Sequence, residues 1–345
     1  MSIIGAIAVT LIVVRAQADA TRNSALLTKR QSTELGNRCG IQANAARAHK
    51  IFRGKLAAEG QWPAAVAIWL AKRVSKTQMR FVSKTPSCTG ILVSRRHVLT
   101  AAHCTPRASN ADYVNSCRNT KRSDESELAL IAVLGQRRHR WDAARRLADG
   151  NIKRLMLMAT RIHVPREWSN CRRDPWDGGD IAILELADNV REELFQEGIV
   201  NTACLPSNCR NMLPKKMQIF GYGFNPRPNG ANQGALNFGS VTLMSRKECQ
   251  TDYLPPPFRL PKDAICVHEE ASRGALVCGG DSGGPLVTTN NSKLIVAGVV
   301  SLGTSCERAA KTGDQGLASV YTSVRVYTEW ICKVTGICYT TRCGK

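Results

Sequence analysis

The strongest constraint on the fold is a series of short, β-rich runs separated by clusters of turn residues. The runs cover residues 64–71, 89–100, 128–135, 181–186, 217–222, 239–244, 294–302 and 317–324. One stretch with a helical pattern closes the series, from about Val324 to Val334. Because many short strands without long helices between them are typical of barrels and sandwiches, the sequence predicts an all-β protein. Residues from about 105 to 175 are highly charged and are expected to form long surface loops.

The N-terminal segment predicts export from the cell. The apolar run from 3 to 14 is shorter than the roughly 20 residues that cross a bilayer. The spacings Ala16-Gln17-Ala18 and Ala18-Asp19-Ala20 suit signal peptidase. We therefore expect a signal peptide at 1–18 and a secreted, extracellular protein, with a buried N-terminal strand as the alternative. No other apolar run in the sequence is long enough to span a membrane.

A polar segment follows, from 19 to 50. It contains the dibasic pair Lys29-Arg30 and shows no hydrophobic period, so it is expected to be a propeptide. The pattern changes abruptly after Lys50, where the sequence continues Ile51-Phe52-Arg53-Gly54.

The chain has 14 cysteines. An even number of cysteines in an exported protein predicts disulfides. Zinc is the alternative, but no Cys-x-x-Cys pair occurs, and the cluster Cys332, Cys338 and Cys343 has no histidine nearby. We expect neither a metal nor a cofactor.

The formal net charge is +21. A charge of this size predicts attraction to polyanions such as heparin-like glycans or nucleic acid, and a solvated basic surface is the alternative. The basic clusters lie at 121–122 and 137–146.

Three side chains stand in settings that suit nucleophilic catalysis. Ser282 lies among glycines that leave its hydroxyl uncovered, in the run Cys278-Gly279-Gly280-Asp281-Ser282-Gly283-Gly284-Pro285. His103 follows small residues at the end of an apolar run, and Asp180 follows two glycines and opens another. A serine needs a base within hydrogen-bond reach, and the base needs a third group that orients it. The three residues supply these groups.

The segments around these residues carry a family resemblance. Thr100-Ala101-Ala102-His103-Cys104, Asp180-Ile181-Ala182-Ile183-Leu184 and Gly280-Asp281-Ser282-Gly283-Gly284-Pro285 resemble the three signatures of the chymotrypsin-like (trypsin-like) serine endopeptidases. The resemblance covers about 51–334. It implies two six-stranded antiparallel β-barrels, at about 51–195 and 210–325, and a C-terminal helix at about 324–334, in a peptidase domain of 51–345.

The resemblance also implies roles for single residues. Ser282 would attack the scissile carbonyl of a protein or peptide substrate, His103 would take and return its proton, and Asp180 would orient the imidazole. The N–H groups of Gly280 and Ser282 would bind the oxyanion. Because His103 must be neutral to act as a base, activity should fall in mild acid.

A zymogen is implied as well. An activating protease would cut after Lys50, and the new ammonium of Ile51 would pair in the interior with the carboxylate of Asp281. Phe52 and Arg53 depart from the small residues usual in the family after the new N-terminus.

Specificity would depend on the pocket for the residue before the cut. By alignment on Cys278 and Ser282, its floor falls at Leu276, where trypsins carry an aspartate. The other pocket residues would be Ser301, Leu302, Gly303 and Ser319. An apolar floor offers no counter-charge to Lys or Arg, so a preference for Leu, Met, Phe or Tyr is expected. Plain core packing of Leu276 is the alternative.

The family implies four disulfides: Cys39–Cys204, Cys88–Cys104, Cys249–Cys266 and Cys278–Cys306. The first would keep the propeptide attached after activation. Sequence does not fix the connectivity of the remaining cysteines; we pair Cys117 with Cys171, Cys209 with Cys332 and Cys338 with Cys343.

Two other interpretations use the same fold. A catalytically silent homologue would act as a basic, polyanion-binding protein, although no member of the triad is lost here. A polyanion-binding protease would use the basic loops to set its location or substrates. We expect a monomer. Asn290-Asn291-Ser292 is the only N-glycosylation sequon, in an expected surface turn.

Overall fold

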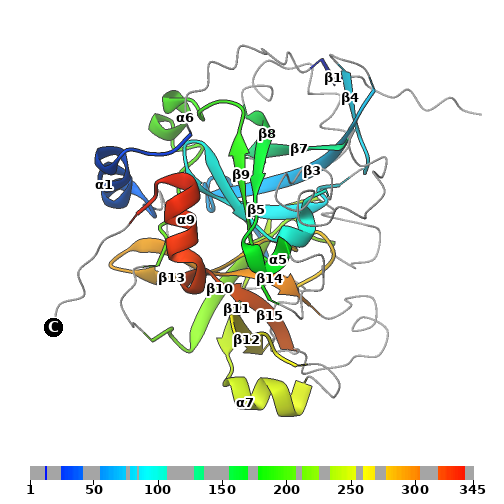
Figure 1. Ribbon diagram of the computed structural model, residues 1–345, viewed down its shortest axis with the longest axis vertical. Coiled ribbons are helices and arrows are strands. Elements are labelled where there is room, and N and C mark those ends of the chain that lie inside the picture. The colour runs from blue at the N-terminus through cyan, green and yellow to red at the C-terminus, as the bar shows by residue number, and fades with distance from the viewer. Residues whose placement is uncertain are drawn as a thin grey trace, which may run out of the picture.

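The computed structural model describes residues 12–13, 25–41, 55–74, 78–83, 85–106, 128–135, 155–169, 178–206, 212–224, 234–253, 259–268, 277–303 and 318–338. Two groups of antiparallel strands lie one above the other in Figure 1. No helix within the described ranges has the length and apolar character needed to cross a membrane.

The upper group is a closed barrel of six strands. Their order is β3 (Ala65–Arg73), β5 (Cys88–Ser94), β6 (His97–Thr100), β9 (Ala182–Leu186), β8 (Met156–His163) and β7 (Leu128–Leu134). The barrel closes because β7 pairs back with β3, from Val66↔Leu134 to Lys72↔Leu128. Two further strands extend the sheet: β4 (Gln78–Phe81) pairs with the end of β3, and β1 (Ile12–Val13) pairs with β4.

The lower group closes in the same way. Its order is β10 (Lys216–Gly221), β13 (Pro285–Asn290), β14 (Lys293–Leu302), β15 (Ala318–Ser323), β12 (Ala264–His268) and β11 (Asn237–Leu243). Pairing of β10 with β11 completes the ring. The short strand β2 (Lys55–Leu56) pairs with β11. Residues 55–56 were expected in the first barrel, and the structure adds them to the second.

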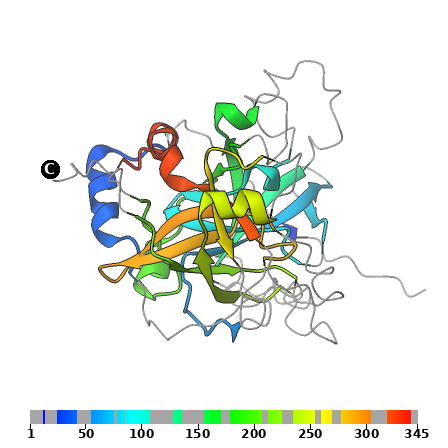
Figure 2. The same ribbon diagram turned by 90° about the horizontal axis from the view of Figure 1, so that it is seen from below.

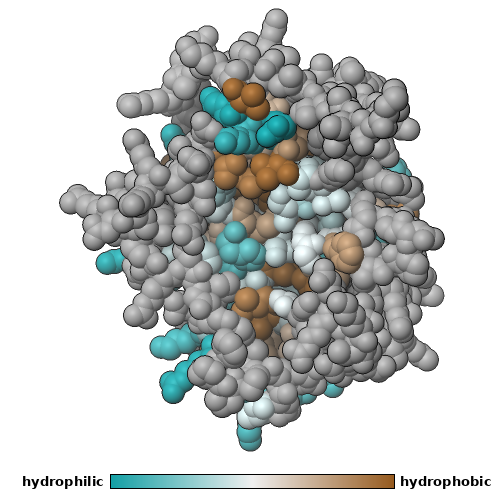
Figure 3. Space-filling view, turned by 90° about the vertical axis from the view of Figure 1, so that its right-hand side faces the viewer, coloured by the Kyte–Doolittle hydropathy of each residue, from teal (hydrophilic) through white to brown (hydrophobic). Residues whose placement is uncertain are grey.

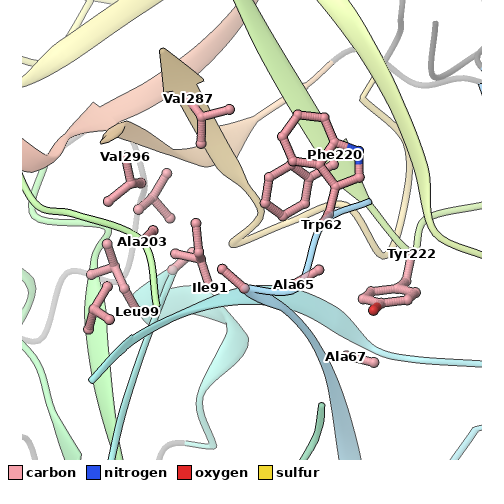
Figure 4. Packing of buried hydrophobic residues seen from close by; sticks show 14 of the residues in the cluster. Trp62, Ala65, Ala67, Ile91, Leu99, Ala203, Phe220, Tyr222, Val287 and Val296 are labelled. Atoms are coloured by element: carbon pink, nitrogen blue, oxygen red, sulfur yellow. The ribbon is translucent and has the colours of Figure 1, made fainter. Parts of the chain in front are cut away.

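Alternation along the strands explains how both barrels are filled and joined. In β3, Val66 and Ile68 point into one core cluster, while Ala65, Ala67 and Trp69 belong to the other. Most of this strand is packed on both faces and is therefore apolar from Ala65 to Ala71, while Lys72 and Arg73 at its end are exposed. The cluster that contains Ala65, Ala67 and Trp69 is shared by the two barrels. Figure 4 shows Ile91 and Leu99 of the first barrel facing Val287 and Val296 of the second barrel.

Trp62 and Phe220 stack at the same interface, with ring centroids 4.6 Å apart (Figure 4). Aromatic pairs of this geometry add to the stabilisation that area burial provides. The interface is therefore a packed core that fixes the position of one barrel relative to the other.

Helices are short and lie outside the barrels. They are α5 (Arg166–Ser169), α6 (Glu192–Gln196), α7 (Arg246–Glu248) with the π-helical turn η6 (Cys249–Tyr253), the 3-10 turn η1 (Ala102–Cys104), and at the end η7 (Val324–Tyr327) followed by α9 (Thr328–Thr335). The helix expected at 324–334 therefore begins with a 3-10 turn. Gly336, in the left-handed region at φ 75°, ends it.

The polar N-terminal segment, expected to be a propeptide without a hydrophobic period, contains a helix. Residues Lys29–Arg38 form helix α1, which Thr28 and Gln31 start with a reciprocal capping box. Figures 1 and 2 both show α1 beside α9, and Leu27 N donates to Thr335 O at 2.8 Å. Capping and docking stabilise this helix, so a hydrophobic period was not required. Ile12 and Val13, within the expected signal peptide, form the two-residue strand β1.

Several strands also differ from the expected runs. The run 89–100 contains two strands, β5 and β6, joined by a tight turn at 95–96. Strand β8 lies in the region expected to be surface loop. The sequence did not predict it, because its residues are only partly buried and do not form a continuous apolar run. Strand β13 was not predicted, because it starts at Pro285 directly after a glycine-rich stretch that is typical of a turn.

The face of the molecule in Figure 3 carries a band of described side chains in which brown, apolar groups alternate with teal, hydrophilic groups. The described part of this face therefore presents mixed polar and apolar surface.

Candidate active site

The histidine and the aspartate meet because their strands are paired. Strands β6 and β9 are antiparallel neighbours, with Thr100 opposite Ala182. His103 follows the end of β6 and Asp180 precedes the start of β9, so both lie at the same end of the pair. His103 Nδ1 is 2.7 Å from Asp180 Oδ2, and the backbone N–H of His103 donates to Asp180 Oδ1 at 2.9 Å.

The carboxylate of Asp180 is fully buried, with 0% of the residue exposed. It is stabilised by hydrogen bonds from both barrels: Ser301 Oγ, on β14 of the second barrel, donates to Oδ2 at 2.6 Å. A buried carboxylate with three donors stays oriented and satisfied. The arrangement directs Nδ1 of the His103 ring toward the carboxylate, so Nε2 is the ring nitrogen that remains for proton transfer.

The turn that carries Asp180 is held by residues that sequence reasoning missed. Gly178 and Gly179 have φ of 87° and 75°, a region that favours glycine. Gly179 N donates to Asp263 Oδ2 at 2.9 Å, and Tyr327 OH donates to the same oxygen at 2.6 Å. Asp263 lies at the start of β12, where it reads as an ordinary turn residue, so the sequence carried no signal for this contact.

Thr322 was missed for the same reason. Its Oγ1, on β15, donates to the backbone carbonyl of Asp180 at 2.9 Å. The first-barrel turn therefore depends on Asp263, Tyr327 and Thr322, all of which come from the C-terminal half of the chain.

The environment of His103 sets its protonation. Burial is the largest single influence on the pKa of His103 and lowers it, but the hydrogen bond and the negative charge of Asp180 together outweigh burial. The net result is a pKa raised above the ordinary value of a histidine. The ring is thus a stronger base than a free imidazole, and it is protonated more easily as the pH falls.

The loop of Ser282 approaches His103 through glycine. A Cβ on Gly283 would lie 2.9 Å from Ala101 N and would overlap Thr100 Oγ1, so a larger residue cannot occupy this position. Thr89 N donates to Ser282 O at 2.9 Å. The Cys88–Cys104 disulfide joins the neighbour of Thr89 to the neighbour of His103. These links place the Ser282 loop against the end of β6, which the segment of His103 follows.

Among the described contacts, no hydrogen bond joins Ser282 Oγ to the His103 ring. Both residues stay partly exposed, in contrast to the buried Asp180. A bond between nucleophile and base often tightens only when substrate is present, so this geometry is compatible with a catalytic pair.

The loop also presents unused backbone donors. Gly280, at φ 95°, and Ser282 are partly exposed, and their N–H groups donate to no group in the described part of the protein. The neighbouring N–H groups do have acceptors: Asp281 N donates to Cys278 O and Gly283 N donates to Val300 O, each at 2.9 Å. Two unpaired donors on either side of Asp281, at a partly exposed turn, can bind an oxyanion.

Asp281 points away from solvent. Its carboxylate is buried and accepts from Gly223 N at 2.8 Å and Cys278 N at 3.0 Å. Burial raises the pKa of Asp281 to about 6, although the two backbone hydrogen bonds oppose the shift. Within the described residues no cation contacts this carboxylate. Lys50 and Ile51, the expected activation residues, lie outside the described part of the chain.

The expected specificity pocket is described only in part. Ser301 and Ser319 are buried, Leu302 is half-buried and Gly303 is exposed. A Cβ on Gly303 would lie 3.2 Å from Val277 O, so the segments 301–303 and 277–280 run close together. Leu276, the expected floor, lies outside the described residues and directly precedes Val277.

The structure contains three of the family disulfides: Cys39–Cys204, Cys88–Cys104 and Cys249–Cys266. Cys278 is disulfide-bonded, and its expected partner Cys306 lies outside the described residues.

The pairings of Cys209 with Cys332 and of Cys338 with Cys343 are wrong, because Cys332 pairs with Cys338. The turn at Gly336 brings the chain after α9 back toward the helix, so the two cysteines come together locally. The expected pair Cys117–Cys171 lies outside the described residues, as do Cys209 and Cys343.

One cluster resembles a metal site by distance alone. Ligand atoms of Cys88, His103 and Cys104 lie within 4.8 Å of one another. Both cysteines are in a disulfide, which leaves no thiolate to bind a metal.

Comparison with known proteins gives a single family. Among curated proteins, the chain is 26% identical over 305 residues to transmembrane protease serine 11C of Mus musculus, covering 88% of this chain and 58% of that protein. It is 25% identical over 293 residues to mannan-binding lectin serine protease 1 of Homo sapiens, covering 84% and 36%. It is 26% identical over 300 residues to tissue-type plasminogen activator of Pongo abelii, covering 85% and 46%.

The chain thus spans between 36% and 58% of the length of these relatives. A family model described as Trypsin matches residues 51–331, which include both barrels and the segments of His103, Asp180 and Ser282. With this match and the closed pair of six-stranded barrels, the chain belongs to the trypsin family of serine proteases.

Proposed function

We propose that this chain is a secreted serine endopeptidase that hydrolyses peptide bonds through an acyl-enzyme. Ser282 Oγ attacks the scissile carbonyl while His103 Nε2 takes its proton, and the same ring returns the proton to the leaving amine. Asp180 holds the ring and stabilises its charged form. The single observation that carries this proposal is the 2.7 Å contact between His103 Nδ1 and the buried carboxylate of Asp180.

The negative charge that develops on the carbonyl oxygen needs donors that are already in place. The free N–H groups of Gly280 and Ser282 are suited to this role, because they are partly exposed and donate to no described group. Donors of this kind contribute several kcal/mol of transition-state stabilisation in acyl transfer, about 3 kcal/mol for each.

The test of catalysis compares the wild type, two active-site variants and one control variant, all made in the same way. After treatment with a trypsin-like activator, the wild type should degrade denatured protein, and Ser282→Ala and His103→Ala should show no activity above the activator alone. Thr289→Ala is the control, because Thr289 is an exposed residue of β13 outside the proposed site. Degradation by Ser282→Ala equal to the wild type would exclude the mechanism.

Activation is proposed to follow cleavage after Lys50. Asp281 supports this step: its buried carboxylate has two backbone donors, and burial raises its pKa to about 6. A carboxylate in such a site is stabilised by a partner cation, and the new ammonium of Ile51 would supply one. Lys50→Gln should stay inactive after treatment with the activator. Full activity of this variant would remove the activation model.

We propose an apolar preference before the scissile bond, for Leu, Met, Phe or Tyr. The preference rests on Leu276, whose side chain offers no counter-charge to Lys or Arg. A panel of fluorogenic peptides that differ only at this position tests it. Cleavage chiefly after Arg or Lys would show that Leu276 is not the floor of the pocket.

The net charge of +21 is the observation behind a second candidate function, polyanion binding. The basic loops at 121–122 and 137–146 that would carry it lie outside the described residues. Retention on heparin that persists above physiological salt and falls steeply as salt increases would support this function. Elution at or below physiological salt would exclude it. A silent homologue would bind heparin and hydrolyse nothing.

A further inference from the structure

Thr89 connects three segments of the active site. It lies in β5 of the first barrel and is fully buried. Its N–H donates to Ser282 O and its carbonyl accepts from Thr100 Oγ1, each at 2.9 Å. Its hydroxyl donates to Gly280 O at 2.9 Å and accepts from Tyr222 N at 3.0 Å. The side chain therefore reaches from one barrel to the nucleophile loop of the other.

The contact with Gly280 acts on the orientation of the backbone donors. A planar trans peptide directs its C=O and the N–H of the following residue to opposite sides, so holding a carbonyl also fixes the N–H of the next residue. Phe224 N donates to Gly279 O at 2.7 Å, which directs the Gly280 N–H away from that carbonyl. Thr89 Oγ1 holds the next carbonyl, that of Gly280 itself. Both peptide planes that flank Gly280 are thus anchored.

Anchoring matters because Gly280 is free to rotate. With φ at 95° it occupies a region open to glycine, and glycine has no side chain to restrict the peptide planes on either side. The Gly280–Asp281 peptide links the two free donors, and its N–H is held by Cys278 O while its carbonyl is held by Thr89 Oγ1. Without the Thr89 bond this peptide keeps only one of its two anchors, and the N–H groups of Gly280 and Ser282 on either side lose part of the restraint on their common direction.

Only a hydroxyl can serve both neighbours of this side chain. Tyr222 N is a donor and Gly280 O is an acceptor, and a threonine or serine hydroxyl accepts from one and donates to the other. Space is also limited, since a Cβ on Gly221 would lie 3.2 Å from Thr89 Oγ1 and one on Gly284 would lie 3.4 Å from Thr89 Cβ.

We propose that Thr89 is a positioning residue for the oxyanion site: its hydroxyl holds the Gly280–Asp281 peptide, which links the two donors, and so keeps the N–H groups of Gly280 and Ser282 directed at the substrate carbonyl. The inference rests on the proposed peptidase function. It adds a residue from the first barrel to a site whose donors belong entirely to the second.

The experiment uses the full chain after activation and compares Thr89→Val, which removes the hydroxyl, with Thr89→Ser, which keeps it. The matched control is Thr202→Val. Thr202 is also buried, but it lies beside Cys204, and its hydroxyl makes no hydrogen bond in the described structure. For each protein, kcat and KM are measured with a peptide amide, together with the inhibition constant of a peptide aldehyde, which forms a tetrahedral adduct with the nucleophile.

If the backbone donors lose their orientation, the free energy of the transition state should rise, while substrate binding in the ground state should change little. We expect kcat of Thr89→Val to fall roughly ten- to hundredfold, less than the loss of an oxyanion donor itself, with KM within about twofold. The aldehyde should bind more weakly by the same factor as kcat/KM falls. Thr89→Ser should recover most of kcat, and Thr202→Val should match the wild type.

Three results would overturn the inference while leaving the proposed function intact: an unchanged kcat in Thr89→Val, a change confined to KM, or equal impairment of the valine and serine variants. Thr89→Ala gives the same comparison with less steric demand should the valine variant not fold. A wild type that hydrolyses no peptide would instead contradict the proposed function.

Discussion

The buried carboxylate of Asp281 should make the stability of the uncleaved chain depend on pH in an unusual direction. Its pKa is raised from 3.8 to about 6, mainly by burial. A difference of this size corresponds to about 3 kcal/mol in the free energy of unfolding. Because the folded state binds the proton more tightly, this contribution is fully present below about pH 4. It is lost as the pH rises to about 6 and above.

Cleavage after Lys50 should reverse this dependence. An ammonium paired with Asp281 would lower the pKa of the carboxyl below that of the unfolded chain, so its contribution would be gained as the pH rises. The sign of the pH dependence therefore reports whether the ion pair forms. The uncleaved and cleaved forms provide the two states in a single protein.

The assay is urea unfolding followed by tryptophan fluorescence, with disulfides intact, from about pH 3 to 7. Ser282→Ala serves as the background to prevent self-digestion, and Asp281→Asn in that background removes the titrating group. The difference between the two proteins should change by about 3 kcal/mol across this range before cleavage and should change with the opposite sign after it. The same slope in both forms would refute the ion pair.

Other predictions concern catalysis and the N-terminal segment. The acid limb of kcat/KM should have its midpoint above about pH 6.5, since Asp180 raises the pKa of His103; full activity at pH 5 would contradict this. Ser301→Ala should lower kcat/KM about tenfold, because it removes a hydrogen bond to a buried charge; wild-type kinetics would contradict it. Cys204→Ser should release the fragment that carries α1 on a non-reducing denaturing gel after cleavage, whereas the wild type should retain it.

The sequence predicted those parts of the molecule whose signals are local. His103, Asp180 and Ser282 each stand in a short segment of small or apolar residues, and the structure joins the first two through neighbouring strands. Most of the β-rich runs are strands in the structure. They could be predicted because alternation and turn residues act over a few positions. The barrel number and closure came from family resemblance, and the pairing of β7 with β3 and of β10 with β11 confirms them.

Contacts between distant segments could not be predicted. Thr89 was counted only as a strand residue, yet its hydroxyl bonds to Gly280, 191 positions away. Asp263 similarly supports Gly179, 84 positions away. Such contacts depend on how the barrels pack, which no short window of sequence encodes. Helix α1 forms without a hydrophobic period because capping and docking stabilise it.

The most direct test of the central claim is labelling of the activated protein with a fluorophosphonate, followed by peptide mapping. We expect one label for each molecule, located on Ser282, and a loss of labelling in His103→Ala. Labelling should also fall at a pH low enough to protonate His103. A folded, activated wild type that takes up no label, or that carries the label on another residue, would contradict the assignment of Ser282 as an activated nucleophile.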